Sequence, residues 1–179
     1  MTTDAADSDE EFCIFCLIAN GRDKETKIIK KNKDLVCFRD IYPAAPHHFL
    51  VVPREHIHSC HSLHRGHINV VKQMAQLGKA VLHEQGITNM KDVRLGFHQP
   101  PYISVGHLHL HVLAPASEIS FDLVYKFTPK AYNFLTVSSF FPIPPHCLNV
   151  HPLLILTFGS PVSVNLFVLA GRTSIETST

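Results

Sequence analysis

Residues 107–113 read HLHLHVL, so three histidines alternate with bulky apolar residues. In an extended chain, side chains two positions apart lie on the same face. We therefore expect His107, His109 and His111 to line one face of a strand. The other face would then carry Leu108, Leu110 and Val112. Such a row of imidazoles can attack phosphorus, can chelate a metal ion, or can lie exposed to solvent.

The apolar setting of the row favours a chemical role over simple exposure. A neutral imidazole attacks through one nitrogen while the other donates its proton to a fixed acceptor. The ordinary histidine pKa of about 6.5 keeps this neutral form available near neutral pH. Histidine is also unusually frequent, with 14 residues against 16 lysines and arginines together.

Length and charge limit the classes of function. The chain has 179 residues and a formal net charge of +1, which gives no whole-chain reason to expect nucleic acid or a membrane as partner. Its start, MTTDAADSDEE, is acidic and differs from a secretion signal. Together with five cysteines, this favours a reducing compartment, so we expect a cytoplasmic or nuclear protein.

The charge pattern divides the chain into three parts. We interpret residues 1–11 as a disordered acidic tail and residues 12–130 as the functional domain. Beyond residue 130 the charged residues are Arg172 and Glu176, so 131–179 reads as an atypical apolar and irregular tail. Its stretch 152–171 has the length of a membrane span, but Gly, Ser, Pro and Asn interrupt it, which argues against a span.

Hydrophobic periodicity within the domain indicates an α+β fold. A helical pattern at 13–20 and a longer one from Ser62 to Gln85 predict one short and one long helix, with Gly86 ending the second. Five segments read as strands, namely 26–32, 34–41, 47–53, 92–98 and 107–115. The order lacks βαβ alternation, so we expect an antiparallel sheet of about five strands.

At this point the sequence resembles a known family. HLHLHVL fits the signature of the histidine triad superfamily of nucleotide hydrolases and transferases, and residues 37–57 and 93–115 resemble its central strand pair and terminal hairpin. CIFC at 13–16 and GFHQPP at 96–101 resemble its nucleotide-binding branch. The resemblance covers about residues 12–128. It implies a nucleoside phosphoramidase or acyl-nucleotide hydrolase that cleaves adenosine 5′-monophosphate conjugates through a covalent nucleotidyl-histidine.

The resemblance also implies catalytic roles. His109 would be the nucleophile, His111 would stabilise charge on the phosphate oxygens, and His48 would be an additional pocket histidine. His107 would organise the site without reacting. Ser104 would bond a phosphate oxygen or the leaving group, although a turn hydroxyl is the alternative. No metal is required for this chemistry.

A second set of residues is implied for binding the nucleotide. Asp40 would accept both ribose hydroxyls, with Ile41 beside it, although a carboxylate that caps a turn is the alternative. Phe15 and Ile18 would wall the base, or they could simply be core. The remaining members are His98, which stands where relatives often carry Asn, and the triad residues His107, Leu108 and His109.

The two cysteines of CIFC form half of a metal site, which is weak evidence alone. Some members of the resembled family complete four ligands with two histidines. Here these would give a structural zinc site of Cys13, Cys16, His56 and His107. Two free thiols in a short helix are the alternative.

Other functions stay open beside the leading one. The resemblance implies purine nucleotide conjugates as substrates and a homodimer as the assembly. One rival is a nucleotide-binding regulatory adaptor whose hydrolysis is incidental, and another is a metal-binding histidine strand. A third is an aprataxin-like deadenylase of nucleic-acid ends. The lack of a second zinc motif after residue 130 and of a basic patch argues against nucleic acid.

Overall fold

One antiparallel sheet of six strands, in the order β1-β2-β3-β5-β4-β6, carries the histidines. The computed structural model describes residues 12–129 and 131–140, so the predictions for 1–11 and 141–179 lie outside them. The strands are β1 (Ile28–Lys31), β2 (Leu35–Arg39), β3 (His47–Pro53), β4 (Arg94–His98), β5 (Leu110–Ala114) and β6 (Phe134–Thr136). With helices α2 (Ile14–Ala19) and α3 (Ile68–Glu84), they confirm the predicted α+β class.

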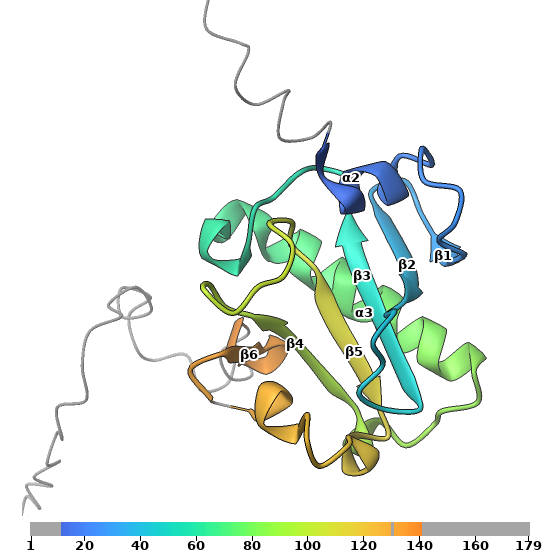
Figure 1. The fold of residues 1–179 in the computed structure, drawn as a ribbon, viewed down its shortest axis with the longest axis vertical. Helices are drawn as coiled ribbons and strands as arrows, with labels where there is room; N and C mark the ends of the chain where they lie inside the picture. The colour runs from blue at the N-terminus through green and yellow to red at the C-terminus, as the bar shows by residue number, and fades with distance from the viewer. Residues whose placement is uncertain (1–11, 130, 141–179) are drawn as a thin grey trace, which may run out of the picture. The chain divides into compact units, whose positions relative to one another are not determined.

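Helix α3 covers one face of the sheet and runs behind the strands in Figure 1. Its apolar stripe packs on the side chains of β3 and β5 that point to that face, including Val51, Leu110 and Val112. None of the helices within the described ranges is long and apolar enough to cross a membrane.

The long helix begins later than its sequence pattern suggests. Ser62 ends the 3-10 turn η1 (Cys60–Ser62), and a second turn, η2 (Arg65–His67), precedes Ile68. Leu63 has extended backbone angles, and the N–H of Gly66 is taken by the His64 ring, so the chain turns twice before α3 starts. Gly86 follows the helix with a φ of 84°, as expected for this end.

The opposite face is covered near its β1–β2 side by α2. Phe15 and Ile18 of this helix pack with Val36, Phe38 and Leu50 in a separate apolar cluster. The strand alternation therefore works as predicted, since β5 sends Leu110 and Val112 toward α3 and His111 to this second face, where Leu113 also lies.

The sixth strand was not predicted. We placed residues 131–179 in an irregular tail, but Phe134–Thr136 pairs with β4, with Phe97 opposite Leu135. Phe134 is fully buried, and its ring lies over Gly96, which has no side chain to exclude it. A strand of three residues is too short to show alternation, so its stability comes from this tertiary contact.

The ladder of β5 begins at Leu110, so the predicted strand at 107–115 is too long at its start. The pairing of β3 with β5 stops at Val51 opposite Leu110. His107, Leu108 and His109 precede the ladder, and the N–H of Leu108 donates instead to the carbonyl of Ile57 at 2.6 Å. Two of the three triad histidines are therefore held by contacts outside the sheet.

Replacing Gly96 with alanine should test the contact that seats β6. The added Cβ would lie 2.5 Å from the Phe134 ring and 2.8 Å from the Leu135 carbonyl oxygen. We expect Gly96→Ala to lower the free energy of unfolding by about 1–3 kcal/mol through overpacking, measured by urea denaturation. In a Phe134→Leu background the same change should be milder, since the ring is gone. Strictly additive effects would contradict this account.

Candidate active site

Five of the predicted site residues meet on the sheet face opposite α3. Asp40 follows β2, His48 lies in β3, His98 ends β4, His109 precedes β5 and His111 lies within it. The ring centroid of His111 lies 5.1 Å from that of His109, 5.2 Å from that of His48 and 4.6 Å from that of His98. Neighbouring strands thus bring together residues that are up to 71 positions apart.

The His109 ring has a defined tautomer. Its Nδ1 lies 2.6 Å from the carbonyl oxygen of His107, which can only accept, so Nδ1 carries the proton. In the neutral ring, Nε2 then has a free lone pair. Burial lowers the pKa of His109, although the same hydrogen bond and the nearby Asp40 charge act in the opposite direction. This is the state that a nucleophilic imidazole requires.

A chain of hydrogen bonds fixes the opposite tautomer in His111, with the proton on Nε2. The N–H of Ala44 donates to Nδ1 of His48 at 3.0 Å, so the proton of His48 lies on Nε2. That Nε2 lies 2.9 Å from Nδ1 of His111 and donates to it, which places the His111 proton on its own Nε2. This last atom is buried and has no hydrogen-bond partner among the described residues. It is a donor available to a ligand.

The surroundings of these rings favour their neutral forms. Burial lowers the pKa of His48 and of His98 to about 4, with the Arg39 charge contributing to the first. Burial also lowers the pKa of His107 to about 4 and takes that of His111 well below its ordinary value. Neutral rings carry one proton each, so the assignment of donors and acceptors above is determined.

Asp40 lies against the histidine chain. Its Oδ2 is 3.3 Å from Nε2 of His48, and its Oδ1 accepts the N–H of Tyr42 at 2.9 Å. Burial raises the pKa of the carboxyl group. Asp40, His48 and His111 are close enough to hold a metal, but Nε2 of His48 carries a proton because Nδ1 is occupied by Ala44. The donor set therefore does not suit a metal ion here.

A second cluster of possible metal ligands surrounds His107, the first residue of the triad. Cys16 Sγ is 3.1 Å from Nδ1 of His56 and 3.4 Å from Nδ1 of His107, which is also 3.4 Å from Cys13 Sγ. Ligand atoms around one tetrahedral zinc lie roughly 3.5 Å apart, given its bond lengths. His107 Nε2 donates to the Pro53 carbonyl at 2.9 Å, which leaves Nδ1 free for the metal. The residues present fit zinc.

Other predicted residues lie outside the histidine group. Leu108 is buried in the core beneath α3 and cannot line a nucleotide pocket with its side chain, because it points to the opposite face. Ile18 is buried in the α2 cluster, whereas Phe15 from the same helix places its ring 5.2 Å from that of His109. Ile41 is exposed beside Asp40, and Ser104 is exposed in the loop before the triad.

Sequence reasoning missed the wall formed by the C-terminal part of the domain. The Phe127 ring lies 5.0 Å from His98, 5.3 Å from His111 and 5.4 Å from His48. The carbonyl oxygen of Asn133 lies 3.3 Å from Nδ1 of His98 and accepts from it. The available signal was the aromatic run of Phe127, Tyr132 and Phe134, which is denser than a surface loop needs.

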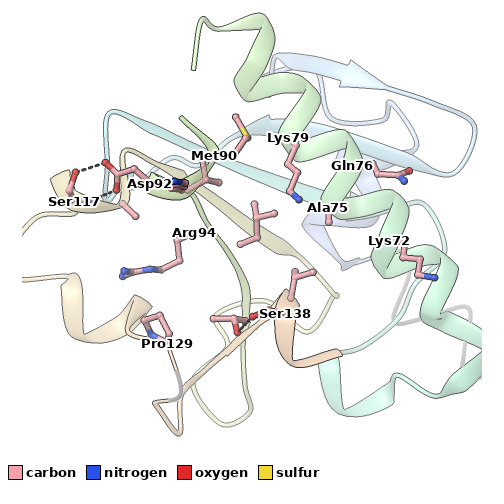
Figure 2. A pocket seen from close by; sticks show the side chains of 16 residues that line it. Lys72, Ala75, Gln76, Lys79, Met90, Asp92, Arg94, Ser117, Pro129 and Ser138 are labelled. Atoms are coloured by element: carbon pink, nitrogen blue, oxygen red, sulfur yellow. Dashed lines mark hydrogen bonds between the residues drawn. The ribbon is translucent and has the colours of Figure 1, made fainter. Parts of the chain in front are cut away.

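A hollow of about 1030 Å³ lies away from this chemistry (Figure 2). It opens between α3, the start of β4 and the 3-10 turns around Asp92 and Ser117, which are hydrogen-bonded to each other. Its basic side chains are Lys72, Lys79, Lys91 and Arg94. None of the predicted site residues lines it, so its size alone does not make it the active site.

Comparisons with known proteins agree with this geometry. The family model "Scavenger mRNA decapping enzyme C-term binding" matches residues 12–126. The chain is 51% identical to adenosine 5′-monophosphoramidase HINT3 of Danio rerio over 69% of this chain and 77% of that protein. It is 48% identical to the Mus musculus protein of the same name, over 70% and 76% of the two chains.

A solved structure of a histidine triad protein matches the fold. A HIT family hydrolase from Legionella pneumophila matches with a TM-score of 0.53 and 30% identity, over 57% of this chain and 91% of that one. Within the family, the CIFC start and the GFHQPP loop point to histidine triad nucleotide-binding protein 3, and the relatives confirm that prediction. The chain therefore belongs to the histidine triad superfamily, close to its HINT3 members.

Proposed function

We propose that this protein is an adenosine 5′-monophosphoramidase, which hydrolyses the P–N or acyl-phosphate bond of AMP conjugates. The observation that carries the proposal is a pair of neighbouring imidazole rings, of which one presents an unprotonated Nε2 and the other a protonated Nε2. His109 offers the lone pair of Nε2, and His111 offers an Nε2–H donor without a protein partner in the described structure. The relatives named adenosine 5′-monophosphoramidase support this reaction class.

The first proposed step forms a covalent intermediate. Nε2 of His109 attacks the α-phosphorus, the P–N bond breaks, and the leaving amine takes up a proton from solvent. The His111 Nε2–H donates to a non-bridging oxygen, where charge grows in the transition state. Nδ1 of His109 keeps its proton and donates it to the His107 carbonyl oxygen, so the charged nucleotidyl-imidazole is stabilised by a hydrogen bond that already exists.

The second step restores the enzyme. Water attacks the phosphorus, the bond to His109 breaks, AMP leaves, and the water releases one proton to solvent.

We propose that Asp40 accepts the ribose hydroxyls, since its carboxylate lies beside His48 and adjoins exposed Ile41. Phe15 would then flank the nucleoside, and His98 with Phe127 would face the leaving group. Ser104 could reach it by a movement of its exposed loop.

The cluster of Cys13, Cys16, His56 and His107 is proposed to hold a structural zinc ion. Bound zinc would cross-link α2 to the segment before β5, and no reaction step passes through it. We also propose a homodimer and a cytoplasmic or nuclear location. β6 occupies the edge of β4 along Gly96–His98. A second copy could therefore contact this side of the sheet only through the start of β4 and the neighbouring helix α3.

Removal of the nucleophile should abolish turnover without abolishing binding. We expect His109→Asn to lower kcat for adenosine 5′-phosphoramidate at least about a thousandfold, while AMP affinity changes little. During turnover, intact-protein mass spectrometry should find one AMP on the peptide that contains residues 107–111 in the unmodified chain and none in the variant. His83→Ala, at an exposed position of α3, is the matched control.

Two outcomes would reject this proposal. An active His109→Asn variant, or an AMP adduct on another residue, would remove His109 from the mechanism. Nucleotide binding without turnover in the unmodified chain would instead support the regulatory adaptor.

The neutral histidines predict that stability falls between about pH 6.5 and pH 4. Burial holds the pKa of His48 and His98 at about 4, while in the unfolded chain histidine takes up its proton near 6.5. The unfolded state therefore binds more protons in this window, and unfolding becomes easier as the pH falls. Below about pH 4 both states are protonated, and this contribution levels off.

Urea denaturation at a series of pH values measures this effect. In His48→Phe the slope of unfolding free energy against pH should decrease by up to about 1.4 kcal/mol per pH unit, because one buried neutral ring is gone. The exposed His83→Ala should keep the original slope. An unchanged slope in His48→Phe would show that His48 is protonated in the folded state.

A further inference from the structure

The segment that carries the nucleophile is not held by the sheet. His107, Leu108 and His109 precede the first residue of β5, and their contacts are local. The N–H of Leu108 donates to Ile57, and Nε2 of His107 donates to Pro53. The other ring nitrogen of His107 faces the two cysteine sulfurs.

His107 therefore links two sites through one residue. Its ring belongs to the thiol–histidine cluster of Cys13, Cys16, His56 and His107, and its carbonyl oxygen accepts the proton of His109 Nδ1. If the His107 ring moves, the peptide that carries this carbonyl turns with it. The acceptor that keeps the His109 proton on Nδ1 would then be displaced.

Helix α2 provides a second link between the cluster and the nucleophile. Cys16 lies in this helix, next to Phe15. The Phe15 ring makes edge contacts with both His107 and His109, at 6.0 and 5.2 Å between centroids. A cross-link through Cys16 thus also fixes the ring that packs on the nucleophile.

His111 is independent of this arrangement. It lies inside the sheet, opposite Leu50 on β3 and opposite Gly96 on β4. Its tautomer depends on His48 and Ala44, which do not contact the cluster in the described contacts. Asp40 is likewise held beside His48. Damage to the cluster should therefore affect the nucleophile selectively.

We propose that the thiol–histidine cluster is a positioning device for catalysis, in which His107, held by Cys13, Cys16 and His56, keeps its carbonyl oxygen against Nδ1 of His109 and so aims Nε2 of that ring at the substrate. The inference rests on the proposed function and extends it from a structural zinc site to one that controls the nucleophile. Loss of the cluster lowers kcat far more than it weakens nucleotide binding, because Asp40, the proposed ribose ligand, is held beside His48 outside the cluster.

Paired variants of the full chain test this proposal. His56→Ala removes one ligand, whereas His56→Cys keeps four ligands of a type that binds zinc. Cys37→Ala removes a buried thiol from the core outside the cluster and is the control for a general loss of stability. Three quantities are measured for each variant: zinc per chain, kcat and KM with adenosine 5′-phosphoramidate, and the ¹⁵N shifts of the His109 ring.

The expected result separates positioning from folding. The unmodified chain should bind one zinc, and its His109 shifts should report a single Nδ1–H tautomer. His56→Ala should lose the zinc, show mixed tautomers and lose at least tenfold in kcat, with KM within twofold. His56→Cys should retain all three properties. Cys37→Ala should keep zinc, tautomer and kcat at temperatures where it is folded.

Contrary outcomes are equally definite. A zinc-free chain with an unchanged tautomer and kcat would overturn the proposal, and so would equal losses in kcat and nucleotide affinity. If His56→Ala does not fold, zinc removal from the unmodified chain by a chelator, followed by zinc addition, applies the same criteria. If the unmodified chain shows no turnover, the proposed function fails, while the tautomer shift on zinc removal still decides whether the cluster positions His109.

Discussion

The site depends on one hydrogen bond, from Nδ1 of His109 to the backbone carbonyl of His107. A neutral imidazole has a single ring proton, so fixing it at one nitrogen leaves the other able to attack. A backbone carbonyl is a suitable partner because it cannot donate, and the choice of tautomer therefore cannot reverse. Burial then disfavours the charged ring, which would have no lone pair at either nitrogen.

The same counting of protons explains the neighbouring ring. The amide of Ala44 is a fixed donor at the start of the hydrogen bonds that run through His48 to His111, whereas the carbonyl of His107 is a fixed acceptor for His109. His111 consequently presents a proton where His109 presents a lone pair. A phosphate group needs both, because its phosphorus accepts electrons while its oxygens accumulate charge. Leaving this donor unpaired costs about 1–3 kcal/mol, which a bound anionic oxygen would recover.

The sequence predicted the parts of this site that follow from alternation and residue type. Three histidines at alternate positions were enough to place His109 and His111 on one face, and spacing with the family resemblance brought Cys13 and Cys16 together with His56. Contacts that depend on tertiary structure were not predictable. β6 exists because Phe134 fits over Gly96, and Phe127 reaches the histidines from a turn without any periodic pattern. Alternation also cannot tell whether an extended segment is paired, so the start of β5 was placed three residues early, at 107 instead of Leu110.

Because residues 107–109 are not paired in the sheet, the backbone carbonyl of His107 is free to accept the hydrogen bond of the nucleophile His109. Within a ladder, the carbonyl of a residue is normally engaged by an N–H of the neighbouring strand. His107 precedes the ladder, and its carbonyl accepts from the side chain two residues ahead. The segment consequently lacks the support that holds His111, and Ile57, Pro53 and the two cysteines supply other contacts in its place. The fold thus uses the sheet to hold the proton donor and a side-chain cluster to hold the nucleophile, so the two halves of one reaction centre can be disturbed separately.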